Sequence, residues 1–141
     1  MFFGEFEYRI DAKGRVPIPP KFREGLKEGV VLAPGAEKCI TAYPLSQWTK
    51  LANNLTTGQL TQSKLRRLYR AIFATAFNVN IDGQGRIPLP APLRQYAGIE
   101  EDVVVAGANT YIELWNKVEW ESEKAASQAQ AWQLIESLEN R

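Results

Sequence analysis

The sequence predicts an α+β domain, mainly β, that is made of two similar halves. The segment IDAKGRVPIP at residues 10–19 recurs as IDGQGRIPLP at residues 81–90, which is 71 positions later in a chain of 141 residues. Short apolar or alternating segments, separated by Gly, Pro and Asp, surround each copy in the same order, as strands and turns do. An internal repeat of this kind sets the architecture of a chain.

Neither half is long enough to bury a hydrophobic core by itself. We therefore expect the halves to share one core, as a pseudo-dimeric domain with an approximate twofold. The composition, 45% hydrophobic and 23% charged, is that of a globular protein. The predicted division is a first half with its following helix at 1–55, a basic amphipathic linking helix at 56–76, and a second half with an acidic C-terminal helix at 77–141.

Each half has the predicted order strand, strand, short helix, strand, strand, followed by longer helices. The short helices begin at proline and are expected to close near Gly25 and Gly98. A capping box of Asn116 and Glu119 starts the last helix. The predicted strands are 4–10, 16–19, 30–33, 39–43, 76–81, 87–90, 103–106 and 111–115, and the predicted helices are 20–26, 45–55, 61–76, 91–99 and 116–139.

A tight turn is predicted inside each copy of the repeat. Gly14 and Gly85 stand where the turn needs a residue with positive φ, and Asp11 and Asp82 can accept hydrogen bonds from turn amides. The two prolines after each turn are two positions apart, so they remove amide donors from the same edge of a strand. We expect each of these strands to pair mainly along its other edge.

The net charge of +1 conceals an uneven distribution. Residues 1–99 contain 14 Lys and Arg against 7 Asp and Glu, whereas residues 100–141 contain 3 against 9. Basic residues are densest at 8–27. A basic surface beside an acidic tail is typical of a protein with a polyanionic ligand, although ordinary solvated charge gives similar counts.

Catalysis, cofactors and metals are not expected. The chain has no histidine, no phosphate-binding glycine loop and no nucleophile elbow, and Cys39 is its sole cysteine. We expect Cys39 to be a buried thiol. The sequence contains no apolar run of membrane-spanning length and no secretion signal. These features indicate a cytoplasmic protein without a membrane or small-molecule partner.

Several segments resemble the MraZ family of bacterial regulators. They are MFFGEFEYRIDAKGRVPIP at the start, YPLSQW, RRLYRAIFATAFNVNIDGQGRIPLP, LRQYAGI and ELW. Both copies of the family's Asp-x-x-x-Arg signature are in place, as Asp11 with Arg15 and Asp82 with Arg86. The resemblance implies an AbrB-like swapped-hairpin β-barrel, a ring-shaped homo-oligomer located at the nucleoid, and binding to short G-rich direct repeats at the promoter of the division and cell-wall gene cluster.

Within that resemblance, Arg15 and Arg86 are the predicted base contacts, because a guanidinium on a rigid turn can donate to O6 and N7 of guanine. Phosphate contacts fix position without discriminating sequence. The predicted phosphate contacts are Lys13, Arg9, Lys21 and Arg23. The turns themselves are expected to depend on Asp11, Gly14, Asp82 and Gly85. In the other interpretation, each Asp–Arg pair only ties its own turn.

Other charged and apolar residues receive structural interpretations. Arg94, at a helix end, can be a solvated cap, and Phe2 and Phe3 are expected to pack against a neighbour. A basic helical face is interpreted as solvated or as a subunit contact, and it comprises Lys64, Arg66, Arg67 and Arg70. Apolar residues near the chain end can dock on another subunit, and they are Trp132, Leu134, Ile135 and Leu138.

A second class of function is kept open. Barrels of the implied kind also occur in antitoxins, in which appended segments bind a partner protein, and the acidic segment 113–141 could serve that purpose. An antitoxin-like module or a ring-forming scaffold is therefore the alternative to a DNA-binding regulator.

Overall fold

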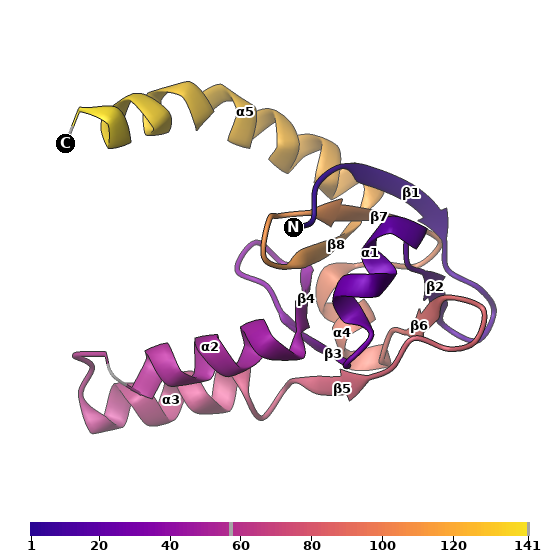
Figure 1. Cartoon of the computed structure of the whole chain (residues 1–141), viewed down its shortest axis with the longest axis horizontal. Coiled ribbons are helices and arrows are strands. Elements are labelled where there is room, and N and C mark those ends of the chain that lie inside the picture. Colours follow the sequence, from indigo (N-terminus) through magenta and orange to yellow (C-terminus); the bar gives the residue numbers. More distant parts are fainter. Residues whose placement is uncertain (57, 141) are drawn as a thin grey trace.

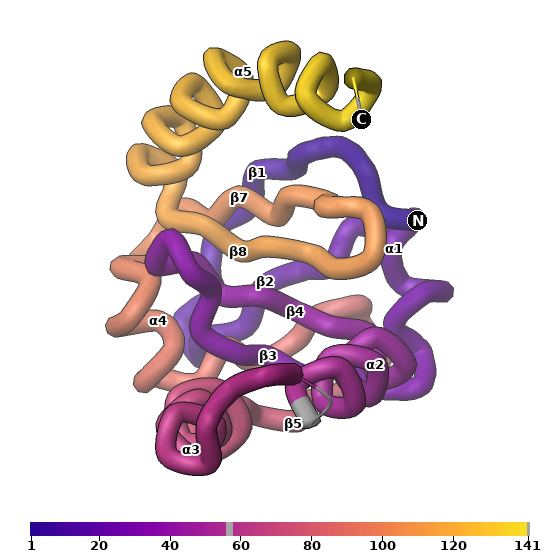
Figure 2. The backbone as a smooth tube through the Cα atoms, turned by 90° about the vertical axis from the view of Figure 1, so that its left-hand side faces the viewer, coloured from indigo at the N-terminus to yellow at the C-terminus, as the bar shows by residue number. Residues whose placement is uncertain are grey.

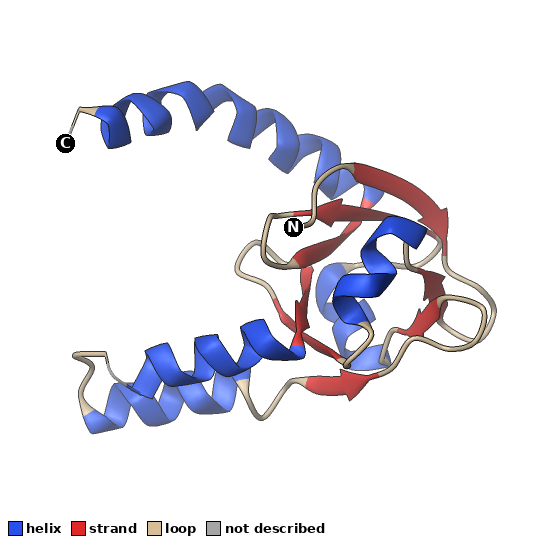
Figure 3. Ribbon diagram, viewed as in Figure 1, coloured by secondary structure: helices blue, strands red, loops and turns tan. Residues whose placement is uncertain are grey.

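Strands from the two halves are interleaved in the sheets of the structure, a computed structural model that describes residues 1–56 and 58–140 (Figures 1 and 3). The first half contributes β1 (Glu5–Arg9), β2 (Arg15–Pro17), β3 (Val30–Pro34) and β4 (Ile40–Pro44). The second half contributes β5 (Phe77–Val79), β6 (Arg86–Pro88), β7 (Asp102–Gly107) and β8 (Ile112–Asn116). The predicted α+β, mainly β class is confirmed.

Most strand pairs join one half to the other. The main sheet has the order β1-β7-β8-β4-β3-β5, and every neighbouring pair in it is antiparallel. Strands β2 and β6 form a separate two-stranded ribbon. Among the described strands, only β3 with β4 and β7 with β8 pair within one half. This interleaving is the swapped-hairpin arrangement that the family resemblance implies.

The strand registers repeat across the twofold. Phe6 of β1 pairs with Val105 of β7, and its counterpart Phe77 of β5 pairs with Leu32 of β3. In the ribbon, Val16 pairs with Ile87, so the pseudo-twofold passes between two equivalent residues. The repeat seen in the sequence is therefore a symmetry of the fold.

The prolines restrict the ribbon as expected. Strands β2 and β6 each have only the other as a sheet neighbour within the described residues. Two backbone bonds extend the pairing: Ile18 N donates to Gly85 O, and Leu89 N donates to Gly14 O, both at 2.8 Å. Each turn is thereby attached to the strand that leaves the other turn.

One core serves both halves. Its fully buried aliphatic residues include Ile18, Leu32 and Ile40 from the first half and Ile87 and Leu114 from the second. Of the two N-terminal aromatics, the packed one is Phe2. That residue is buried and makes an edge contact with Phe22, with ring centroids 5.3 Å apart, whereas Phe3 is exposed.

Two short helices cover the barrel. Helix α1 (Pro20–Arg23) continues as a 3₁₀ turn, η1 (Glu24–Leu26), so the helical segment covers the predicted residues 20–26 and ends one residue after Gly25. Helix α4 (Ala91–Ala97) ends at Gly98, whose φ of 65° forms a left-handed cap that an L side chain would strain. The prediction for Gly98 is confirmed.

The longer helices project from the barrel as two arms (Figure 1). One arm contains α2 (Leu45–Thr56) and α3 (Gln62–Ile72), and the other is α5 (Lys117–Glu139). Asn116 Oδ1 accepts a hydrogen bond from Glu119 N at 3.1 Å, as the capping box requires. Helix α3 lies inside the predicted linking segment 56–76, of which residue 57 lies outside the described residues.

The arms and the ribbon lie at opposite ends of the molecule. Figure 1 shows both arms extending to one side of the barrel, whereas β2, β6 and their turns lie at the far side. In Figure 2, viewed from the side of the arms, α5 runs along one edge of the barrel and α2 and α3 lie at the other. None of the described helices is long and apolar enough to cross a membrane.

Because the halves share one core, they should unfold together. We expect Leu32→Ala, a cavity in β3, to lower the free energy of unfolding by about 2–5 kcal/mol. Urea denaturation followed by tryptophan fluorescence and by far-ultraviolet circular dichroism should give one common midpoint in each protein, lower in the variant than in the wild type. Two separate transitions would show that the halves fold independently.

Candidate nucleic-acid interface

The first turn is shaped by a single carboxylate. Asp11 Oδ1 accepts hydrogen bonds from the backbone amides of Lys13 and Arg15, both at 2.9 Å. Asp11 N also donates to Arg15 O at 2.9 Å, which closes the turn. Gly14 has a φ of 77°, a conformation that glycine adopts without strain.

The second turn has the same geometry. Asp82 Oδ1 accepts from the amides of Gln84 and Arg86, both at 2.9 Å, and Gly85 has a φ of 77°. The structure therefore places both predicted turn residues, an aspartate and a glycine, in the same positions of both turns. The middle residue of the turn differs between the two copies: it is Lys13 in the first turn and Gln84 in the second.

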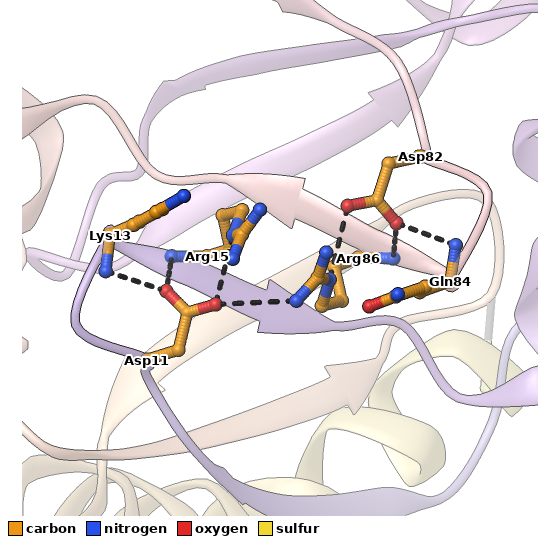
Figure 4. Close-up of polar contacts among 6 residues, drawn as sticks. All are labelled: Asp11, Lys13, Arg15, Asp82, Gln84 and Arg86. Carbon is orange, nitrogen blue, oxygen red and sulfur yellow. Dashed lines mark hydrogen bonds and ion pairs between the residues drawn. The ribbon is translucent and has the colours of Figure 1, made fainter.

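Each aspartate also holds its own arginine. Arg15 Nε donates to Asp11 Oδ2 at 2.9 Å, and Arg86 Nε donates to Asp82 Oδ2 at 3.0 Å. A further ion pair crosses the ribbon, since Arg86 Nη1 lies 3.6 Å from Asp11 Oδ2 (Figure 4). The two arginines, 71 residues apart in the chain, thus share one carboxylate.

Hydrogen bonding keeps both carboxylates ionised. The backbone amide of Arg15 holds the pKa of Asp11 below its ordinary value of 3.8, and the Arg15 guanidinium and the Lys13 amide act in the same direction, while burial opposes them. The pKa of Asp82 is lowered in the same way, chiefly by the backbone amide of Arg86. At neutral pH each arginine is therefore fixed by a charged partner.

The arginines remain accessible from outside the barrel. The Arg15 side chain is 30% exposed and that of Arg86 is 24% exposed. Within the described residues, the terminal nitrogens of Arg15 have no carboxylate partner, because only its Nε is used. A guanidinium held through Nε can present its outer N–H groups to an acceptor pair such as O6 and N7 of guanine.

A second pair of arginines lies beneath the turns. Arg23 Nε donates to Ile18 O at 2.9 Å, and Arg94 Nε donates to Leu89 O at 2.8 Å. A Cβ on Gly85 would clash with the Arg23 guanidinium, and one on Gly14 would lie 3.2 Å from Arg94 Cζ. Each guanidinium therefore packs under the turn of the opposite half.

These contacts give Arg23 a structural position in addition to its predicted role as a phosphate contact. Sequence reasoning treated Arg94 as a possible solvated cap and missed its contact with the opposite turn. The repeat indicates only that Arg94, 71 positions after Arg23, is its counterpart and should share its surroundings. The contact itself depends on how the halves cross.

The remaining predicted phosphate contacts lie in different surroundings. Arg9 is mostly exposed and pairs with Glu101 at 3.3 Å and with Asp102 at 3.8 Å. The Lys21 ammonium lies over two aromatic rings, those of Phe3 at 5.1 Å and Phe6 at 5.2 Å. The exposed Lys13 lies in the first turn itself, beside Arg15 (Figure 4).

The cysteine is poorly placed for chemistry. Cys39 is fully buried, and burial, with the nearby charges of Glu113 and Glu37, raises the pKa of its thiol to about 12. At neutral pH the group is a thiol rather than a nucleophilic thiolate.

The chain consists of two similar halves, each with an arginine bound by an aspartate, and comparison with known families finds the same division. The family model described as "MraZ protein, putative antitoxin-like" matches the chain twice, over residues 1–71 and 72–138. The chain belongs to the MraZ family. The two matches correspond to the two halves of the barrel, and the MraZ resemblance drawn from the sequence is confirmed.

Curated MraZ relatives match over nearly their whole length. A protein of Dehalococcoides mccartyi, named Transcriptional regulator MraZ, is 61% identical over 140 residues, which are 99% of each chain. Proteins with the same name from Acetivibrio thermocellus and Desulforamulus reducens are 43% and 38% identical over 138 residues. Those residues are 98% of this chain and 96% or 97% of the relatives.

The lowered pKa values predict an effect of acid on stability. A carboxyl whose pKa is lower in the folded state stabilises the fold above its unfolded pKa, near 3.8, and this contribution is lost as the pH falls through the folded value. In the double variant Asp11→Asn/Asp82→Asn, each side chain keeps an oxygen that can accept from the backbone amides of its turn but no longer titrates. The stability of this variant should therefore fall less steeply below pH 3.8 than that of the wild type. Thermal melts between pH 2 and 7 measure this difference.

Glu136→Gln/Glu139→Gln, at the exposed end of α5, is the control for loss of two carboxylates. An acid limb of the double variant that parallels the wild type would contradict the assigned ion pairs.

Proposed function

We propose that this MraZ-family chain is a sequence-specific, DNA-binding transcriptional regulator whose DNA-contacting surface is the pair of turns at 11–15 and 82–86. The observation that carries the proposal is the pair of part-exposed arginines, each fixed by an aspartate on a rigid turn and brought together by the ribbon. The names of the MraZ relatives support the regulatory role.

The chemistry of the site fits guanine-containing duplex DNA. Arg15 and Arg86 would contact base edges in the major groove, where one bidentate guanine contact contributes about 1–3 kcal/mol of discrimination. Lys13 would contact phosphate, and Arg9 would do so after exchanging its two acidic neighbours for phosphate oxygens. Arg23 and Lys21 would contribute mainly through their positive field.

The proposed target is the promoter of the division and cell-wall gene cluster, with short G-rich direct repeats, in the cytoplasm at the nucleoid. This target follows from the family resemblance. Catalysis forms no part of the proposal, and the buried Cys39 thiol agrees with that. A single barrel offers few base contacts, so several linked barrels on successive repeats would bind far more tightly than one.

We propose that the two arms mediate such an assembly, as a homo-oligomeric ring. Four basic side chains lie exposed on α3: Lys64, Arg66, Arg67 and Arg70. Helix α5 carries a net negative charge and exposes apolar side chains near its end, of which Trp132 is 75% and Leu138 66% exposed. Opposite charge and unburied apolar area support contact between the arms of neighbouring copies. Because the arms project away from the turns, assembly would leave the turns free for DNA (Figure 1).

The function is tested by fluorescence anisotropy of a labelled duplex from the genomic region upstream of the gene. Wild-type protein should bind this duplex more tightly than a scrambled one, and binding should weaken as salt rises. Arg15→Ala and Arg86→Ala should each lower affinity for the native duplex, by about 5- to 150-fold where a full bidentate contact is lost. The mass of the assembly in light scattering should stay unchanged.

Equal, weak binding of the native and scrambled duplexes would contradict the proposal and favour an antitoxin-like or scaffold module. Dissociation of the assembly by either substitution would assign that arginine to subunit contact instead of DNA.

The role of the arms is tested separately. Trp132→Ala/Leu138→Ala should lower the mass of the assembly in light scattering, because both side chains are exposed in the single chain and available to a neighbour. The melting temperature of the barrel should stay within about 2 °C of the wild type, since exposed substitutions change stability little. An unchanged mass would exclude this face of α5 from assembly.

A further inference from the structure

The two turns are equivalent in backbone but not in their side chains. Lys13 in the first turn is matched by the neutral Gln84 in the second. The same asymmetry continues outside the turns: two positions that carry a cation in the first half, Arg9 and Lys21, correspond to Asn80 and Pro92 in the second. Of these cations, Lys13 lies in the first turn itself, whereas Lys21 belongs to α1, whose Arg23 packs under the second turn. The turns themselves therefore differ by one positive charge, in favour of the first.

The ion pairs differ in the same direction. Asp11 contacts both arginines, whereas within the described residues Asp82 pairs with Arg86 alone. Arg86 is thus held by two carboxylates, at 3.0 and 3.6 Å, and its side chain is less exposed than that of Arg15. The Nη1 group of Arg86 is thus shared with Asp11, which restricts how far it can turn toward a base, while within the described residues Arg15 has both terminal nitrogens free of carboxylates.

We propose that the first turn is the dominant DNA contact, with Arg15 as its principal base-contacting residue and Lys13 as its phosphate contact, and that Arg86 contributes less. The barrel then binds an asymmetric site in one orientation, even though its backbone has a pseudo-twofold. A symmetric pair of turns would favour an inverted repeat, because each turn would contact the same bases on opposite strands. This inference rests on the proposed DNA-binding function.

The charge difference is tested by exchanging the two side chains. Lys13→Gln should weaken binding to the native duplex by about fivefold at 0.15 M salt and flatten the salt slope by about 0.9, the values for one phosphate contact. Gln84→Lys should leave the slope and the affinity nearly unchanged, because in the proposed orientation the second turn contributes little to phosphate contact. The double variant Lys13→Gln/Gln84→Lys keeps the total charge, but we expect its affinity for the native duplex to remain about fivefold below the wild type.

Wild-type affinity in the double variant would overturn the proposal, because it would mean that only total charge matters. The same titrations compare the two arginines: Arg15→Ala should remove the preference for the native over the scrambled duplex, and Arg86→Ala should keep part of it. An equal loss in the two would also overturn the proposal. The exchanges at positions 13 and 84 involve no residue of the aspartate–arginine ion pairs, so the charge test does not depend on the turns surviving the loss of an arginine.

Orientation is tested by directed cleavage. Ala12→Cys and Gly83→Cys are matched exposed positions of the two turns, and a Cβ at Gly83 has open space around it. Because Cys39 is fully buried, an iron chelate can be attached to the new thiol alone. Cleavage from position 12 should fall on one side of each protected segment and cleavage from position 83 on the other.

Cleavage on both sides from both positions would show that the barrel binds in either orientation and would overturn the inference, while selective binding by the wild type would leave the proposed function standing. If the wild type itself binds the native and scrambled duplexes alike, the function fails and the inference fails with it.

Discussion

The pairing of β2 with β6 is the interaction on which the rest of the structure depends. Its central pair joins Val16 of one half to Ile87 of the other, and the flanking backbone bonds attach each turn to the opposite strand. Without this ribbon the two aspartate–arginine turns would stand at the ends of separate hairpins. With it they become one surface, close enough for Arg86 to reach the carboxylate of Asp11.

The same pairing explains why neither half is a separate unit. The edge strands β1 and β5 find their sheet neighbours in the other half, and the core draws on both. The arginines under the turns follow the same pattern, since Arg23 and Arg94 each support the turn of the opposite half. Backbone pairing, core packing and turn support all cross the pseudo-twofold.

Local features of the sequence predicted the local structure well. Proline positions indicated the ribbon strands, and Asp11 and Gly14 with their counterparts indicated turns, because these residues act on the backbone within a few positions. Which strand pairs with which could not be worked out from the pattern, since the partners of β1 and β2 lie some 70–100 residues away. The interleaved pairing of strands from the two halves was predicted only by the family resemblance.

The candidate site shows the same limit. The twin Asp–Arg pairs within each turn follow from spacing, but the ion pair from Arg86 to Asp11 and the packing of Arg94 under Gly14 depend on how the halves cross. In its own helix Arg94 has the position of a solvated cap, and its contact with the opposite turn, like that of Arg23, exists only because the halves cross. In a chain with internal symmetry, an argument made for one residue applies to its counterpart.

Covalent joining of the two halves has a consequence for variation. In a homodimer of single halves, every substitution would occur twice, so a lysine gained in one turn would be gained in both. Here a single gene encodes each turn separately, and one turn has lysine where the other has glutamine while the backbone keeps the same hydrogen bonds. The shared core constrains both halves to remain compatible in shape, but it leaves the exposed positions of each turn free to diverge in sequence independently.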